Sequence, residues 1–244
     1  MDLCECERKI GKIGAGIENT MDRKVSLSEI SDGKLYGLND MVKAGCNDCK
    51  GCSACCKGMG KSIILDPFDI FRFTTNLGKS FEELLNDKIE LNIVDGVILP
   101  NLKMVGESES CAFLNNEGRC SIHANRPGIC RIFPLGRYYE DHAYQYILQI
   151  HECKYKNRSK VKVSKWIDTN DSKRNEQFII DWHYFLKDLQ EQIKKSADST
   201  WIRNINLYLL NAFYQKPYVK DKDFYLQFEE RLELMKSYLV SLER

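Results

Sequence analysis

A dense run of cysteines is the part of this chain best suited to chemistry. Of the eleven cysteines in the 244-residue sequence, five stand at Cys46, Cys49, Cys52, Cys55 and Cys56. Lysine, aspartate and glycine lie between them, so the run does not match an apolar core. Thiolates spaced two residues apart can turn onto the same side of a loop and bind one centre, as in zinc and iron–sulfur sites. The run therefore predicts metal binding.

A second group of cysteines follows downstream, at Cys111, Cys120, Cys130 and Cys153. Cys111 and Cys120 flank a turn sequence at residues 115–118, which can place both thiols side by side. An odd number of cysteines cannot all pair, and the N-terminus lacks the apolar stretch of a secretory signal. We therefore expect a cytoplasmic, reducing location, where such thiols hold metal.

The order and spacing of these cysteines resemble the YkgJ-type cysteine-cluster family, which is described as a zinc- or iron-chelating domain. One matching block is Cys49-x2-Cys52-x2-Cys55-Cys56, and the other comprises residues 111–114, 118–123 and 126–134. The resemblance extends over about residues 46–153. The thiols that match the pattern, and that the resemblance implies as metal ligands, are Cys49, Cys52, Cys55, Cys56, Cys111, Cys120, Cys130 and Cys153.

The metal and the number of centres are left open by these residues. Eight thiolates suffice for two four-ligand centres, or for one cluster with structural thiols beside it. We expect a [4Fe–4S] cluster, because C-x2-C-x2-C is typical of bacterial ferredoxins, although their C-x3-C-P element is missing. Zinc is the alternative. Cys46 is an addition to the family pattern, and the roles of Cys4 and Cys6 are open.

Three basic residues among the downstream cysteines are candidates to contact the centre. Arg126 and Arg131 could offset the negative charge of a thiolate-ligated metal, or could serve as ion pairs and turn anchors. His123 could donate a hydrogen bond to sulfur, pack against a neighbour, or bind metal, and the first two roles are favoured. We predict cofactor contacts for all three residues.

The sequence favours an iron–sulfur protein that acts in redox chemistry or in protein or peptide modification. The alternatives are a zinc-stabilised interaction domain and, from a similarity to part of the flagellin lysine N-methylases, a methylase that uses S-adenosylmethionine. An unidentified protein or peptide is the expected partner. A formal charge of +1 gives no footprint for nucleic acid, and no apolar run is long enough for a membrane. No set of catalytic residues can be assigned, and enzymatic activity is left open.

The remaining sequence predicts an α+β fold, in which a small mixed cysteine-rich core with short hairpins precedes a C-terminal helical bundle. We divide the chain into an N-terminal segment (1–45), a cysteine-cluster domain (46–165) and a helical region (170–244). Apolar periodicity predicts helices over 173–195, 200–214 and 222–243.

Shorter elements are predicted from caps and turns. Asp66-Pro67 and Ser80 should begin two helices, and Asp95-Gly96 should join a hairpin over 89–105. Another hairpin is expected around Glu140-Asp141. We expect a helical turn over 39–44 and a short buried strand over 62–65.

Overall fold

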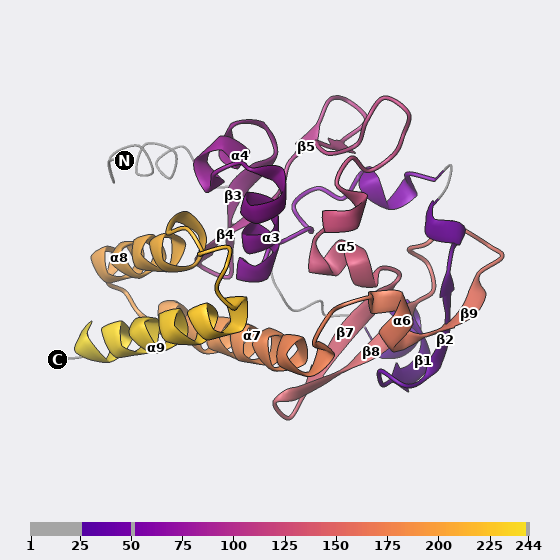
Figure 1. Ribbon diagram of the computed structural model, residues 1–244. Coiled ribbons are helices and arrows are strands. Elements are labelled where there is room, and N and C mark those ends of the chain that lie inside the picture. Colours follow the sequence, from indigo (N-terminus) through magenta and orange to yellow (C-terminus); the bar gives the residue numbers. More distant parts are fainter. Residues whose placement is uncertain (1–25, 50–51, 243–244) are drawn as a thin grey trace. The chain divides into compact units, whose positions relative to one another are not determined.

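The computed structural model describes residues 26–49 and 52–242, which form an α+β fold (Figure 1). The chain divides into two compact units, and the boundary between them falls within the long helix α7 (Ser172–Lys195). The hairpin–helix unit comprises Ile64–Lys103 with residues 186–242, and the cysteine unit comprises residues 26–63 with Met104–Phe185. These two units are defined by packing. They do not test the predicted division into residues 1–45, 46–165 and 170–244, which stays a prediction. Cys4 and Cys6 lie outside the described residues.

The hairpin–helix unit combines one antiparallel hairpin with helices from both ends of its sequence. Its elements are α3 (Pro67–Leu77), α4 (Phe81–Asp87), β3 (Ile89–Val94), β4 (Val97–Leu102), the C-terminal part of α7, α8 (Ser199–Leu210), the π-helical η4 (Asn211–Gln215) and α9 (Phe224–Leu242). The three long C-terminal helices thus occur where apolar periodicity predicts them.

Local signals set the ends of these elements. The Asp66 carboxylate accepts a hydrogen bond from the Asp69 N–H at 2.9 Å and caps α3, as predicted. Asp95 and Gly96 have φ values of 47° and 84°, the left-handed pair that a two-residue hairpin turn requires. A Cβ at Gly96 would also lie 2.6 Å from Ile193 Cγ2, so glycine serves both the turn and the packing of α7.

Aromatic side chains hold α3 and the C-terminal helices of this unit together. The Phe68 and Phe224 rings pack with centroids 4.8 Å apart, which joins α3 to α9. Tyr214 in η4 is fully buried, and its hydroxyl donates a hydrogen bond to the Leu65 carbonyl at 3.1 Å. The core of this unit is therefore apolar and aromatic, with its polar atoms paired.

The cysteine unit is built from small sheets, short helices and turns. It contains α2 (Leu27–Ile30), β1 (Ser31–Tyr36), β2 (Met41–Gly45), η1 (Asn47–Cys49), η2 (Ala54–Cys56), β5 (Met104–Val105), β6 (Ser110–Cys111), η3 (His123–Asn125), α5 (Gly128–Ile132), β7 (Leu135–Glu140), β8 (Ala143–Gln149), β9 (Ser159–Lys162), α6 (Val163–Ile167) and the first part of α7. All its ladders are antiparallel: β1, β8 and β7 form one sheet, β2 pairs with β9, and β5 pairs with β6.

Two local expectations fail and one holds. The predicted helical turn over 39–44 is wrong, because β2 occupies Met41–Gly45 and alternates exposed and buried residues, with Val42 and Ala44 inside. The strand expected over 62–65 is reduced to one bridge, between Ile64 and Asn101. The hairpin expected around Glu140-Asp141 is present as β7 and β8. Among the described residues, no helix is long and apolar enough to span a membrane.

Candidate metal centre

Nine cysteines lie among the described residues, all in the cysteine unit and none in a disulfide. Cys46 and Cys111 are buried and the other seven are half-buried. Thiols in this state retain the donor atoms that a metal requires. The elements around them decide which thiols lie together.

One group of thiols is assembled where the five-cysteine run meets β6. An antiparallel bridge pairs Lys57 with Ser110, and the Gly58 N–H donates to the Glu109 carbonyl at 2.9 Å. This register brings Cys56, one residue before the bridge, next to Cys111, one residue after it. The predicted turn at 115–118 then returns the chain, and a second bridge pairs Leu114 with Cys120.

The acidities of these thiols reflect that proximity. The pKa of Cys55 is lowered to about 7, chiefly by a hydrogen bond with the Cys56 thiol; a backbone N–H and the guanidinium of Arg126 add to this effect, and burial opposes it. The same hydrogen bond raises the pKa of Cys56, together with burial and the charges of Cys55, Cys120 and Cys111. Cys55 is therefore the more acidic thiol of this adjacent pair.

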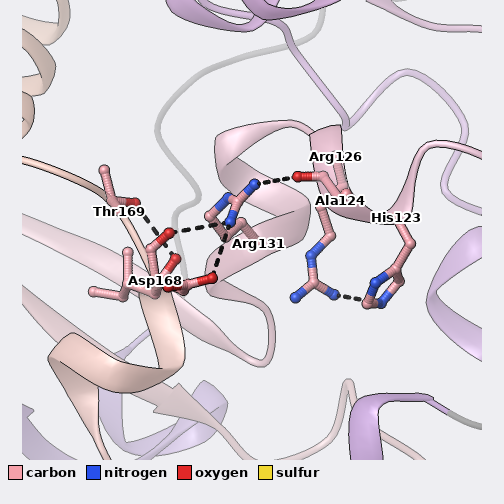
Figure 2. Close-up of polar contacts among 7 residues, drawn as sticks. His123, Ala124, Arg126, Arg131, Asp168 and Thr169 are labelled. Carbon is pink, nitrogen blue, oxygen red and sulfur yellow. Dashed lines mark hydrogen bonds and ion pairs between the residues drawn. The ribbon is translucent and has the colours of Figure 1, made fainter. Parts of the chain in front are cut away.

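Arg126 is a positive charge close to this group. Burial raises the pKa of Cys49 and of Cys120, and the Arg126 guanidinium opposes that rise at both thiols and helps to lower the pKa of Cys55. Its Nη1 atom lies 3.0 Å from the His123 Nε2 atom, as Figure 2 shows. Because the guanidinium is the donor, His123 accepts at Nε2. His123 thus helps to hold Arg126, and its predicted contact with a cofactor stays a prediction.

Arg131 makes a different set of contacts. Its Nη2 donates to the Ala124 carbonyl at 2.9 Å, and its Nη1 donates to the Asp168 carbonyl at 3.2 Å (Figure 2). The Asp168 carboxylate lies 3.9 Å away. These are the contacts of a turn anchor, which is one of the two roles left open for this residue. A contact between Arg131 and a cofactor stays a prediction.

Backbone amides support two of the sulfurs. The Ile122 N–H hydrogen-bonds the Cys120 sulfur, and the Tyr155 N–H hydrogen-bonds the Cys153 sulfur; each lowers the pKa of its thiol against the larger effect of burial. Hydrogen bonds of this kind stabilise the thiolates of metal sites. The donors are thus thiols flanked by N–H groups and guanidinium groups, which suits zinc or iron and not the oxygen-preferring calcium or magnesium.

The ligand set as a whole stays a prediction. Among residues 26–49 and 52–242, no three His, Cys, Asp or Glu side chains are gathered closely enough to hold a metal ion. Cys130 lies in α5, half-buried, and Cys52 and Cys153 lie outside helices and strands. The bridges described above bring Cys56, Cys111 and Cys120 into one neighbourhood.

One residue beside the predicted ligands, Arg158, was not predicted from the sequence. Arg158 lies in the described structure near Cys153, where burial raises the pKa of the thiol and the charge of Arg158 partly offsets that rise. It follows Cys153 by five positions, so the argument that singled out Arg131 after Cys130 could also have identified it.

Comparison of the sequence with known protein families agrees with this chemistry. Residues 48–162 match the model of the CxxCxxCC family, described as a putative zinc- or iron-chelating domain. The CxxCxxCC domain covers just under half of the chain and includes all eight predicted ligands. No curated protein and no solved structure matches the chain. The chain therefore contains a metal-chelating cysteine domain, and its resemblance to the cysteine-cluster family is confirmed.

Proposed function

We propose that the CxxCxxCC domain binds an iron–sulfur cluster of the [4Fe–4S] type through its cysteine thiolates. The observation that carries this proposal is the surroundings of the sulfurs: half-buried thiols within one compact unit, with backbone N–H groups and the Arg126 guanidinium beside them. Positive charge and N–H donors offset the negative charge that thiolates bring to a cluster. The C-x2-C-x2-C spacing supports iron–sulfur ligation further.

A cluster in this position would supply one-electron transfer to a protein or peptide partner. The chain's own residues would hold and tune it. Arg126 would favour the thiolate forms of Cys49, Cys55 and Cys120, and a metal binds only deprotonated cysteine. The turns at Cys56 and Cys120 would fix the sulfurs in place.

Zinc is the second candidate, and one distance favours it. The Sγ atoms of Cys46 and Cys49 lie 3.5 Å apart. Two thiolates on one tetrahedral zinc ion, each about 2.3 Å from the metal, are about 3.8 Å apart. In a cubane each thiolate binds a different iron, which holds the sulfurs farther from one another. This pair is therefore closer to the geometry of a single ion.

Anaerobic purification of the full chain separates the two candidates. An iron–sulfur protein should be brown, with a broad thiolate-to-iron absorption band and about four iron and four sulfide per cluster. A colourless protein with stoichiometric zinc and no sulfide would replace the first proposal by the second. A chain that holds neither metal under these conditions would contradict both.

A further inference from the structure

The end of the β2–β9 ladder places a cysteine outside the family pattern beside Arg158, a half-buried arginine. Gly45 pairs with Ser159 in an antiparallel register. One step beyond this pair, Cys46 follows on one strand and Arg158 precedes on the other. The strands approach closely there, since a Cβ at Gly45 would collide with Ser159 Oγ and lie 3.2 Å from the Ser159 carbonyl oxygen. The ladder thus brings Cys46 alongside the segment that follows Cys153.

The chain then curls so that further thiols lie near Cys46. The Cys49 N–H donates to the Cys46 carbonyl at 3.2 Å, and the Cys52 N–H donates to the Cys49 carbonyl at 3.1 Å. These two successive turns keep the Cys46 and Cys49 sulfurs 3.5 Å apart. Cys153 stands in the loop that leads into β9, close enough to Cys46 and Cys52 for their charges to act on its thiol.

Arg158 gives an independent indication that this place receives negative charge. Its Nη1 atom is buried and has no hydrogen-bond partner among the described residues. A buried guanidinium nitrogen left without an acceptor is costly, and native structures almost always provide one. Thiolates provide that charge only when they are held deprotonated, as a bound metal holds them.

We propose that a second four-thiolate metal centre lies at the end of the β2–β9 ladder. Its ligands are Cys46, Cys49, Cys52 and Cys153. Arg158 supplies its counter-charge. The first centre then uses Cys55, Cys56, Cys111 and Cys120, the thiols next to the Lys57–Ser110 and Leu114–Cys120 bridges, with Arg126 beside them. This inference rests on the proposed metal-binding function and deepens it, because it divides the sulfurs and makes Cys46 a ligand.

The division changes the ligand set implied by the family resemblance. Four thiolates complete a tetrahedral ion or a cubane cluster, so two such sets account for eight cysteines. With Cys46 included, Cys130 is not required by either set. Cys46 and Cys130 are therefore the pair of residues that separates the two ligand assignments.

The test compares Cys46→Ser with Cys130→Ser in the full chain, purified anaerobically. Iron, sulfide and zinc are counted per chain by elemental analysis and native mass spectrometry. We expect two centres in the wild type, half the metal in Cys46→Ser, and full metal in Cys130→Ser. Cys120→Ser should lose the other half. The metal that Cys46→Ser retains also reports that this variant folds.

Each other result has a definite meaning. A wild-type chain without metal overturns the proposed function, and this inference with it. A metal-loaded wild type with one centre, or full metal in Cys46→Ser, overturns this inference alone. Loss of all metal in Cys46→Ser overturns the separation into two centres, unless that variant is unfolded by circular dichroism.

A measurement on the wild type covers that last case. Graded chelation with alkylation and mass spectrometry follows each thiol without any substitution. Cys46 should become reactive together with Cys49, Cys52 and Cys153, at a chelator concentration different from that for Cys120. Release of Cys46 together with Cys120 would overturn the proposal.

Discussion

The hairpin–helix unit and the cysteine unit are stabilised in different ways. Of the twelve largest fully buried side chains among the described residues, eleven belong to the hairpin–helix unit and only Leu135 belongs to the cysteine unit. The cysteine unit instead combines one three-stranded sheet with two two-stranded ladders. Two-stranded ladders are marginally stable on their own. Both units therefore bury apolar side chains, but the largest fully buried ones lie almost all in the hairpin–helix unit, whereas every described cysteine lies in the cysteine unit.

A metal bound by these thiols would therefore have a structural role in the cysteine unit. The bridges that join the thiols of the cysteine unit consist of few residues, such as the single pair Lys57 with Ser110. A metal that bound these thiols would join segments far apart in the chain, and its binding free energy would add to the free energy of unfolding. The hairpin–helix unit gains nothing from the metal directly.

Metal removal should give the largest effect. Structural metal sites contribute on the order of 10 kcal/mol, so chelation should unfold much of the cysteine unit. Hydrogen exchange with mass spectrometry should show fast exchange in β2, β9 and β6 after chelation, with α8 and β4 unchanged. Chelator saturated beforehand with zinc is the matched control. Equal loss of protection in both units would break the comparison.

Arg231 tests the stability of the hairpin–helix unit, and its replacement should give the largest loss of unfolding free energy among the single substitutions considered. It is buried in the hairpin–helix unit and donates to the carbonyls of Ala212, Lys216 and Pro217 at 2.7–2.8 Å. Arg231→Met would leave these carbonyls without the guanidinium and should lower the free energy of unfolding by about 3 kcal/mol. Chemical denaturation measures the change, and metal content should stay at the wild-type value.

Lys236→Met on the same helix is the control for Arg231→Met. Lys236 is exposed and pairs with Glu233 at 2.9 Å, a surface ion pair whose loss should cost about 0.5 kcal/mol or less. An equal effect of the two substitutions would show that the three carbonyl contacts contribute little.

The sequence predicted the hairpin–helix unit better than the surroundings of the sulfurs, for a physical reason. Local signals such as the Asp66 cap and the Asp95-Gly96 turn act within a few residues, and the apolar periodicity of α8 is visible in one segment. Grouping the thiols depends on pairings between distant segments, such as Gly45 with Ser159. Nothing local to Cys46 or Arg158 indicates that register. The strand β2 was likewise missed because its partner β9 lies far along the chain.

Asn206 offers a smaller test of the packed unit. Its side-chain Oδ1 accepts from the Ile98 N–H at 2.6 Å, and its Nδ2 donates to the Gly96 carbonyl at 3.1 Å, so it joins α8 to the hairpin. Asn206→Leu would leave both backbone groups buried without partners and should cost about 2 kcal/mol. Thermal unfolding measures it. Asn204→Leu, at an exposed position of the same helix, should be nearly neutral, and a similar loss in both variants would contradict the assigned role.

Two of the arginines in the cysteine unit, Arg126 and Arg131, allow the smallest of these comparisons. Arg126 lies among the thiols, whereas Arg131 anchors the Ala124 and Asp168 carbonyls. Arg126→Gln removes the charge that favours thiolates and should weaken metal binding about tenfold. Arg131→Gln should keep the metal affinity and lower the free energy of unfolding by about 1 kcal/mol.

Competition with a chelator of known affinity measures the first effect, and denaturation of the metal-loaded chain measures the second. Gln keeps a hydrogen-bonding side chain of similar length in both variants, so the difference between them isolates the positive charge. If Arg131→Gln weakened metal binding as much as Arg126→Gln, then Arg131 would act on the centre too. The predicted cofactor contact of Arg131 would then be supported over its role as a turn anchor.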